Sequence, residues 1–208
     1  MTIIMSMTDP TCITTASGLL GDDEIIAFPT DTVYGIGGNL YSYQAIKKLY
    51  QVKTRSHQKA IAVLIGNFDQ LSLVITKLSP VAANLAAKYW PGALTLIVPK
   101  LEGLPDNLSP FPTVGIRMPD HWFALELINS VGPLATTSAN ISGQKDLVTC
   151  REVINQLGEK IKLIIDGGKT RGGIPSTVVD CTQPYPVILR EGGISKIEIM
   201  SQIKNWMD

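Results

Sequence analysis

The chain has 208 residues, of which 45% are hydrophobic and 17% are charged. Lysines and arginines together number 18, as do aspartates and glutamates, so the formal net charge is zero. This composition is typical of a globular protein with one good core, and it argues against a general nucleic-acid coat or a polybasic membrane binder. The three cysteines are widely spaced without a CxxC pair, which favours free thiols in a reducing compartment over a zinc site.

The N-terminal segment MTIIMSMTDP has neither a basic start nor a long apolar run. It therefore matches neither a signal peptide nor a membrane anchor. We expect a cytoplasmic protein that has no membrane partner and forms a single domain over residues 1–208.

Short apolar runs alternate with helical patterns along the chain, which indicates an α/β fold. A first helix is predicted over 42–52, where apolar residues recur at helical spacing. A second begins with Ser79 as N-cap and Pro80 at its first position, and it must stop at the Trp-Pro-Gly sequence that follows. A third begins with a capping box between Thr149 and Glu152. Strands are predicted at 24–28, 60–65, 94–98, 114–118, 134–137, 163–166, 177–180 and 187–189.

The last third of the chain has more predicted strands than helices. Glycine pairs at 167–168, 172–173 and 192–193 are expected to form turns between them. A purely parallel, doubly wound sheet does not fit this pattern. We therefore expect a twisted sheet of mixed parallel and antiparallel strands, flanked by helices.

The segment FPTDTVYGIGG, residues 28–38, is predicted to be a strand end that continues into a glycine-rich turn. Such turns often bind phosphate. This one contains no lysine or arginine, and instead has three hydroxyl side chains, those of Thr30, Thr32 and Tyr34. Asp31 between them is expected to stabilise the turn.

A basic stretch, VKTRSHQK, follows the first predicted helix and contains Lys53, Arg55 and Lys59. Arginine forks and lysine point charges on such a connection could surround a polyphosphate. The alternative is a solvated turn whose charges complement the helix C-terminus, which is the more frequent arrangement for such a stretch. His57 in the same turn is expected to be a surface residue.

The segment LATTSANISG places small polar side chains directly after an apolar strand. They suit a site that bonds phosphate, ribose or a base without adding charge, and an ordinary polar turn remains an equal alternative. These residues are Thr136, Thr137, Ser138, Asn140 and Ser142.

Two arginines stand in or beside predicted strands. Arg117 lies inside an apolar strand, where a charge needs an anion or a carboxylate, so an ion pair and a ligand contact fit equally well. Arg190 leaves the strand 187–189 just before two glycines, and Ser176 enters the strand at 177–180. Arg190 could stack on a base or reach a phosphate, or it could be a surface residue.

Six motifs occur in a fixed order: PTDTVYG, KxR with a lysine four residues after the arginine, RMP, TSANISG, PSTVVD and LREG. Together they resemble the YrdC-like threonylcarbamoyl-AMP synthases of the TsaC type, over about residues 24–199. The chain looks like the short, single-domain form of that family.

The resemblance implies a twisted mixed sheet with a large, concave, basic-rimmed surface. It also implies a nucleotidyltransferase that makes L-threonylcarbamoyladenylate from L-threonine, bicarbonate and ATP, with release of pyrophosphate. A separate tRNA threonylcarbamoyl transferase complex would use the product to modify tRNA, and direct contact with tRNA is a further possibility.

The resemblance also assigns residues. The nucleotide site corresponds to Lys53, Arg55, Lys59, Ser138, Asn140, Ser142 and Arg190. The threonine site corresponds to Thr30, Thr32, Tyr34, Arg117 and Ser176. Lys53 and Arg55 are expected to be catalytic because cations stabilise the charge that builds on the phosphates. Mg²⁺ is expected to be held mainly by the ATP phosphates and water. Leu64 stands where some longer members have a histidine, so no histidine role is carried over.

An alternative function is a non-catalytic module that binds tRNA or double-stranded RNA on a basic concave surface. The zero net charge and the lack of interleaved basic and aromatic residues weigh against it.

Overall fold

The structure is a computed structural model that describes residues 1–56 and 58–207. Its strands are β1 (Ile3–Ser6), β2 (Ile26–Phe28), β3 (Gly35–Asn39), β4 (Ala62–Leu64), β5 (Leu94–Pro99), β6 (Thr113–Arg117), β7 (Leu134–Ser138), β8 (Leu163–Asp166), β9 (Thr177–Asp180) and β10 (Val187–Arg190). Its α-helices are α1 (Cys12–Gly21), α2 (Tyr43–Lys53), α3 (Pro80–Tyr89), α4 (Trp122–Val131), α5 (Cys150–Leu157) and α6 (Lys196–Met207). His57, expected at the surface, lies outside the described residues.

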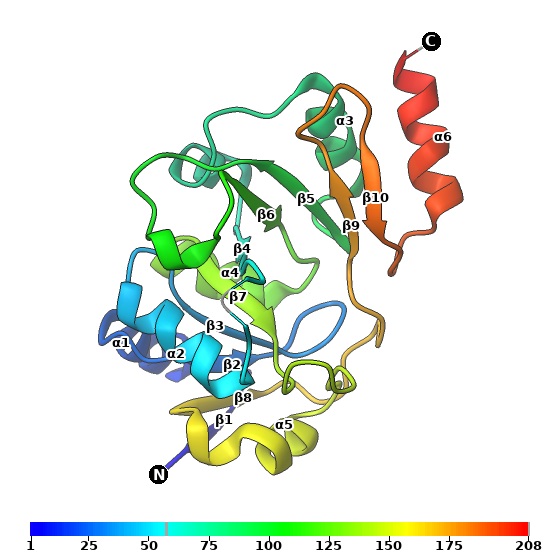
Figure 1. Ribbon diagram of the computed structural model, residues 1–208. Helices are drawn as coiled ribbons and strands as arrows, with labels where there is room; N and C mark the ends of the chain where they lie inside the picture. The colour runs from blue at the N-terminus through cyan, green and yellow to red at the C-terminus, as the bar shows by residue number, and fades with distance from the viewer. Residues whose placement is uncertain (57, 208) are drawn as a thin grey trace.

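Within these residues, ten strands form one sheet in the order β1-β8-β2-β3-β7-β4-β6-β5-β9-β10 (Figure 1). Four neighbouring pairs are parallel and five are antiparallel. The expected mixed sheet with flanking helices is therefore confirmed. None of the helices described is long and apolar enough to cross a membrane.

The three helices predicted from the sequence are present, with the expected caps. The Ser42 side chain accepts a hydrogen bond from Ala45 N at 3.0 Å at the start of α2. Ser79 caps α3, which begins at a proline. The capping box of α5 is complete, because Thr149 and Glu152 each bond the other's backbone N–H. Side-chain oxygens thus satisfy N–H groups that would otherwise lack partners at these helix starts.

The prediction of a glycine-rich turn after residue 28 is wrong in part, because Gly35–Asn39 form strand β3. A Cβ atom on Gly37 would lie 3.0 Å from Phe28 Cε1 and 3.1 Å from Thr136 Oγ1. A Cβ on Gly38 would lie 3.1 Å from that of Ala45. These glycines therefore allow close packing of neighbouring strands and of α2, and only residues 29–34 form the connection.

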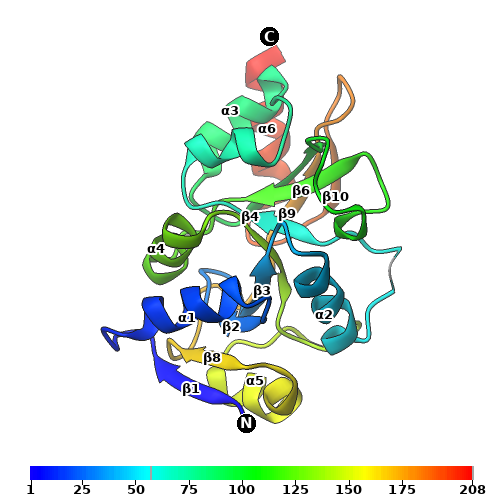
Figure 2. The same cartoon turned by 90° about the vertical axis from the view of Figure 1, so that its left-hand side faces the viewer.

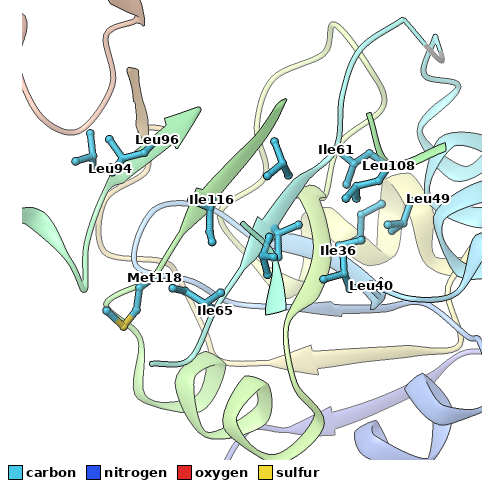
Figure 3. Close-up of a cluster of buried hydrophobic side chains, with 14 of the residues drawn as sticks. Ile36, Leu40, Leu49, Ile61, Ile65, Leu94, Leu96, Leu108, Ile116 and Met118 are labelled. Carbon is cyan, nitrogen blue, oxygen red and sulfur yellow. The ribbon is translucent and has the colours of Figure 1, made fainter. Parts of the chain in front are cut away.

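Two buried clusters of apolar side chains stabilise the sheet. The larger contains residues of α2, α3, α5 and α6 together with Ile36, Leu96 and Ile116 of the central strands (Figure 3). The smaller contains residues of α1 and α4, with Phe28 and Leu64 from the strands. Figure 2 shows the corresponding pairs of helices, with α1 beside α4 and α3 beside α6.

Candidate functional site

A pocket of about 340 Å³ opens over the middle of the sheet. Alternate residues of the central strands line it, and their registers match: Ala62 pairs with Thr136, and Ile97 pairs with Gly115. Because side chains alternate between the two faces of a strand, these paired residues all point to one face. The opposite face, which carries Ile116, is covered by the larger apolar cluster.

The floor of the pocket consists of small residues. Gly35, Ala62 and Gly115 all line it. A Cβ on Gly115 would lie 3.2 Å from Thr95 Cγ2, so a larger residue here would fill the space above the sheet. The pocket therefore owes its depth to small residues, of which only Gly35 lies in a segment that the sequence singled out for binding.

Arg117 lies at the end of β6 with only 7% of its surface exposed. Its Nε donates to Gly92 O at 2.9 Å, its Nη1 to Thr32 Oγ1 at 2.9 Å, and its Nη2 to Asp31 Oδ1 at 2.5 Å. The sequence left open whether this arginine meets a carboxylate or a ligand. The structure shows the ion pair with Asp31, while two of the five guanidinium N–H groups have no partner among residues 1–56 and 58–207.

Two features of the site change the pKa of Arg117 in opposite directions. Burial lowers the pKa of Arg117, and the adjacent Asp31 carboxylate partly offsets that effect. Asp31, which the sequence suggested only as a turn residue, therefore stabilises a buried cation.

The connection over 29–34 forms one wall of the pocket through Thr30 and Thr32. The Thr30 hydroxyl donates to Val33 O at 2.7 Å and lies 3.0 Å from Thr32 Oγ1. The backbone N–H groups of Gly172 and Gly173 bond this connection from outside, at Asp31 O and Thr32 O. The wall is therefore held by contacts with β6 and with the β8–β9 connection.

Tyr34 lines the pocket, but its hydroxyl is engaged elsewhere. It donates to Gly168 O at 2.8 Å and accepts from Gly167 N at 3.1 Å. Burial raises the pKa of Tyr34 to about 12, so this hydroxyl stays protonated. The resemblance assigned Tyr34 to the threonine site, and in the structure its hydroxyl joins the 29–34 connection to the turn after β8.

Replacing Tyr34 with phenylalanine should lower the free energy of unfolding by about 1–3 kcal/mol, because Gly167 N and Gly168 O lose a buried partner. Urea denaturation measures this change. The matched control is Tyr185→Phe, since Tyr185 is 70% exposed. Equal stability of the two variants would contradict this role for Tyr34.

Two hydroxyl groups and an arginine form the wall opposite the 29–34 connection. Ser176 Oγ and Thr95 Oγ1 lie 2.7 Å apart, so one hydrogen bond joins them, and the second hydroxyl hydrogen has no acceptor within the described part of the chain. Arg190 donates to Ser176 O from Nε at 3.1 Å and from Nη2 at 2.8 Å. Thr95 was missed by the sequence reading, although a polar residue inside an apolar strand could have signalled it.

Arg55 brings a cation to the other end of the pocket. Its Nε donates to Lys59 O at 3.2 Å and its Nη2 to Ala60 O at 2.8 Å. Three of its N–H groups have no partner among the residues described. The solvated-turn alternative therefore does not account for Arg55, because backbone oxygens orient its guanidinium at the pocket.

Lys53 is the last residue of α2 and is only 1% exposed. Its ammonium donates to Ser138 O, to Asn140 O at 2.6 Å and to Asn140 Oδ1 at 2.8 Å. These three acceptors use all three N–H groups of the ammonium. In this structure Lys53 therefore holds the turn after β7, and Ser138 of that turn lines the pocket.

Stability should depend on pH through Lys53. Burial, together with the Arg55 charge, lowers the pKa of Lys53 from 10.5 to about 7, against a smaller opposing effect of Asp146. The unfolded chain then binds more protons than the folded one above pH 7, so stability rises with pH toward about 10. Urea midpoints of the wild type should increase between about pH 6 and 9 relative to those of Lys53→Met. Parallel curves for the two proteins would contradict this assignment.

The remaining predicted nucleotide residues do not line the pocket themselves. Asn140 is 5% exposed and bonds Lys53. Ser142 donates its backbone N–H to Lys53 O at 2.9 Å. Lys59 is exposed, and its carbonyl accepts from Arg55. The structure adds Asp146, a pocket-lining carboxylate that the sequence reading did not single out.

The fold and the pocket define a class of α/β protein with a mixed sheet and an open pocket lined by polar and charged side chains. The chain belongs to the Sua5/YciO/YrdC family, whose model, described as "telomere recombination", matches residues 18–192. The resemblance seen in the six motifs is thereby confirmed.

Individual relatives and solved structures are also similar to this chain. A threonylcarbamoyl-AMP synthase of Bacillus subtilis (strain 168) is 42% identical over 205 residues, which are 96% of this chain and 58% of that protein. The crystal structure of P. abyssi Sua5 complexed with L-threonine has a TM-score of 0.92 at 38% identity, over 98% of this chain and 61% of that one. E. coli YciO shares the fold, with a TM-score of 0.83 at 24% identity over 95% of this chain and 96% of that one. This chain spans less than two thirds of the B. subtilis and P. abyssi proteins.

Proposed function

We propose that this protein makes L-threonylcarbamoyladenylate from L-threonine, bicarbonate and ATP, with release of pyrophosphate. The observation that carries the proposal is that the two ends of one pocket have different polar and charged side chains. One end offers Arg117 and hydroxyls to an amino acid, and the other offers Arg55 and the Ser138 turn to phosphates. The names of the relatives support the same activity, and the P. abyssi structure contains L-threonine.

In the proposed reaction, threonine binds with its carboxylate on the two remaining N–H groups of Arg117. Bicarbonate loses hydroxide to give CO₂, and the neutral amine of threonine attacks the carbon of that CO₂. The proton that leaves the amine combines with the hydroxide, so the products are an N-carboxylate and water. An oxygen of that N-carboxylate attacks the α-phosphorus of ATP, and the bond to pyrophosphate breaks. Arg55 and Arg190 stabilise the charge that develops on the phosphates. Such chemistry requires positioning and no protein nucleophile.

Mg²⁺ accompanies ATP in this proposal, held mainly by phosphate oxygens and water. Among residues 1–56 and 58–207, no three His, Cys, Asp or Glu side chains form a metal-binding group. The product would be the donor for a separate transferase complex that modifies tRNA. We place the protein in the cytoplasm and assign the whole activity to one domain over residues 1–208.

The proposal is tested by measuring pyrophosphate release from ATP, bicarbonate and Mg²⁺, with and without L-threonine. We expect release only with threonine, together with a product of the mass of threonylcarbamoyladenylate. Arg55→Ala should nearly abolish turnover and remain folded. Lys47→Ala, a change at an exposed position of α2, is the control. Release that is independent of threonine, or full activity of Arg55→Ala, would contradict the proposal.

A further inference from the structure

Asp146 is an acidic side chain in a pocket whose other charged groups are arginines. It lies on the connection between β7 and α5 and is half-buried. No other aspartate or glutamate of the described chain lines the pocket. Within that same part of the chain, the Asp146 carboxylate makes no ion pair or hydrogen bond. A carboxylate placed in this way is available to a ligand.

The carboxylate interacts electrostatically with both ends of the pocket. Burial lowers the pKa of Arg190, and Asp146 acts in the opposite direction. Asp146 also opposes the effect of burial and of Arg55 on the pKa of Lys53. Lys53 holds the Ser138 turn, whereas Arg190 holds the Ser176 wall. Asp146 therefore acts on Lys53, which holds the Ser138 turn where the proposed function places the phosphates, and also on Arg190.

A bare carboxylate at this place would repel the phosphates of ATP, because like charges at short range in a partly buried site interact strongly. A divalent cation between them removes the repulsion. Mg²⁺ in ATP sites usually binds one or two carboxylates, several phosphate oxygens and water. One pocket carboxylate beside the proposed phosphate position fits this set of ligands.

We infer that Asp146 is a protein ligand of the Mg²⁺ ion that enters with ATP, directly or through one coordinated water. Arg55 and Arg190, which line the same pocket, would then bind the phosphates that this ion holds. The inference rests on the proposed function, because it takes ATP as the ligand. It adds one residue to a metal site otherwise made of phosphates and water.

The test is ATP binding by titration calorimetry, with and without Mg²⁺ and in the absence of threonine and bicarbonate. For the wild type, Mg²⁺ should strengthen ATP binding. In Asp146→Asn that strengthening should fall by about tenfold, the lower end of the usual effect of changes around a metal site. Without Mg²⁺, the variant should bind ATP more tightly than the wild type, since a repulsive charge is gone. Asp69→Asn makes the same charge change on an exposed residue and should match the wild type.

Each other outcome overturns the inference. An equal effect of Mg²⁺ in the wild type and in Asp146→Asn would mean that Asp146 only balances the nearby cations. Equal weakening of ATP binding with and without Mg²⁺ would identify Asp146 as an acceptor for a ribose hydroxyl. A wild type that binds no ATP would overturn the proposed function as well, so the two failures are distinguishable.

A second readout uses Mn²⁺ in place of Mg²⁺. The electron paramagnetic resonance spectrum of Mn²⁺ with ATP and the wild-type protein should differ from that with Asp146→Asn, because one oxygen ligand or its water changes. The Asp69→Asn spectrum should equal that of the wild type. Identical spectra for all three proteins would exclude Asp146 from the metal site.

Discussion

Replacing Arg117 with methionine should raise the KM for L-threonine about a hundredfold or more, while ATP still binds. Two charge-assisted hydrogen bonds to the threonine carboxylate would be lost, each contributing about 1.5–3 kcal/mol. A loss of about 3 kcal/mol corresponds to roughly a hundredfold change. Threonine-dependent pyrophosphate release gives the KM, and calorimetry gives the affinity for ATP.

The Arg117 variant needs a control for folding, because it leaves Asp31 buried without its partner. Removing one member of a buried pair costs about 3–5 kcal/mol. Combining Arg117→Met with Asp31→Asn removes the unpaired charge and should recover most of that stability. If this double variant folds well and keeps a KM near that of the wild type, Arg117 does not bind threonine.

Replacing Lys53 with methionine should lower the free energy of unfolding by about 2–4 kcal/mol and weaken ATP binding at the same time. The change removes the Lys53 donor from Ser138 O and Asn140 O, whereas Asn140 Oδ1 keeps its bond from Ser138 Oγ. Each buried polar group left unsatisfied costs about 1–3 kcal/mol. Methionine carries no charge, so the variant avoids the free-energy cost of burying the Lys53 ammonium, and this offsets part of the lost stability. Urea unfolding and calorimetric ATP titration measure the two effects.

Lys47→Met is the matched control for this prediction, because it makes the same substitution at an exposed position of the same helix. Its effect on stability should stay within about 0.5 kcal/mol. Lys53→Met as stable as this control would show that the Lys53 ammonium does not hold the turn. Weaker ATP binding with unchanged stability would instead indicate that Lys53 contacts the phosphates directly.

The helices that could be predicted are those with local signals in the chain. Ser42, Ser79 and the Thr149–Glu152 box act on backbone groups within a few residues, so the sequence alone shows them. Strand β3 could not be predicted in this way, because glycine is unfavourable in strands unless another residue must come close. The closeness of Phe28 and Thr136 to Gly37 exists only in the folded sheet.

The sequence identified many residues of the site but not how they pair. Arg117 and Lys53 both stood out as cations, yet their partners Asp31, Thr32 and Asn140 lie far from them along the chain. Pairings of this kind depend on strand order, which composition and periodicity do not contain. Asp146 was overlooked for the same reason, since nothing in its neighbourhood along the chain indicates a pocket.

The pocket walls come from segments that are distant in sequence, and this bears on how the protein is made. Tyr34 bonds Gly168 across 134 residues, and Arg117 bonds Thr32 across 85. Contacts between residues so far apart in sequence form slowly during folding, because a large loop must close before the contact can stabilise the folded state. During synthesis, the polypeptide cannot complete this pocket until Arg190 has left the ribosome, so ligand binding in the pocket would report on completion of the whole sheet.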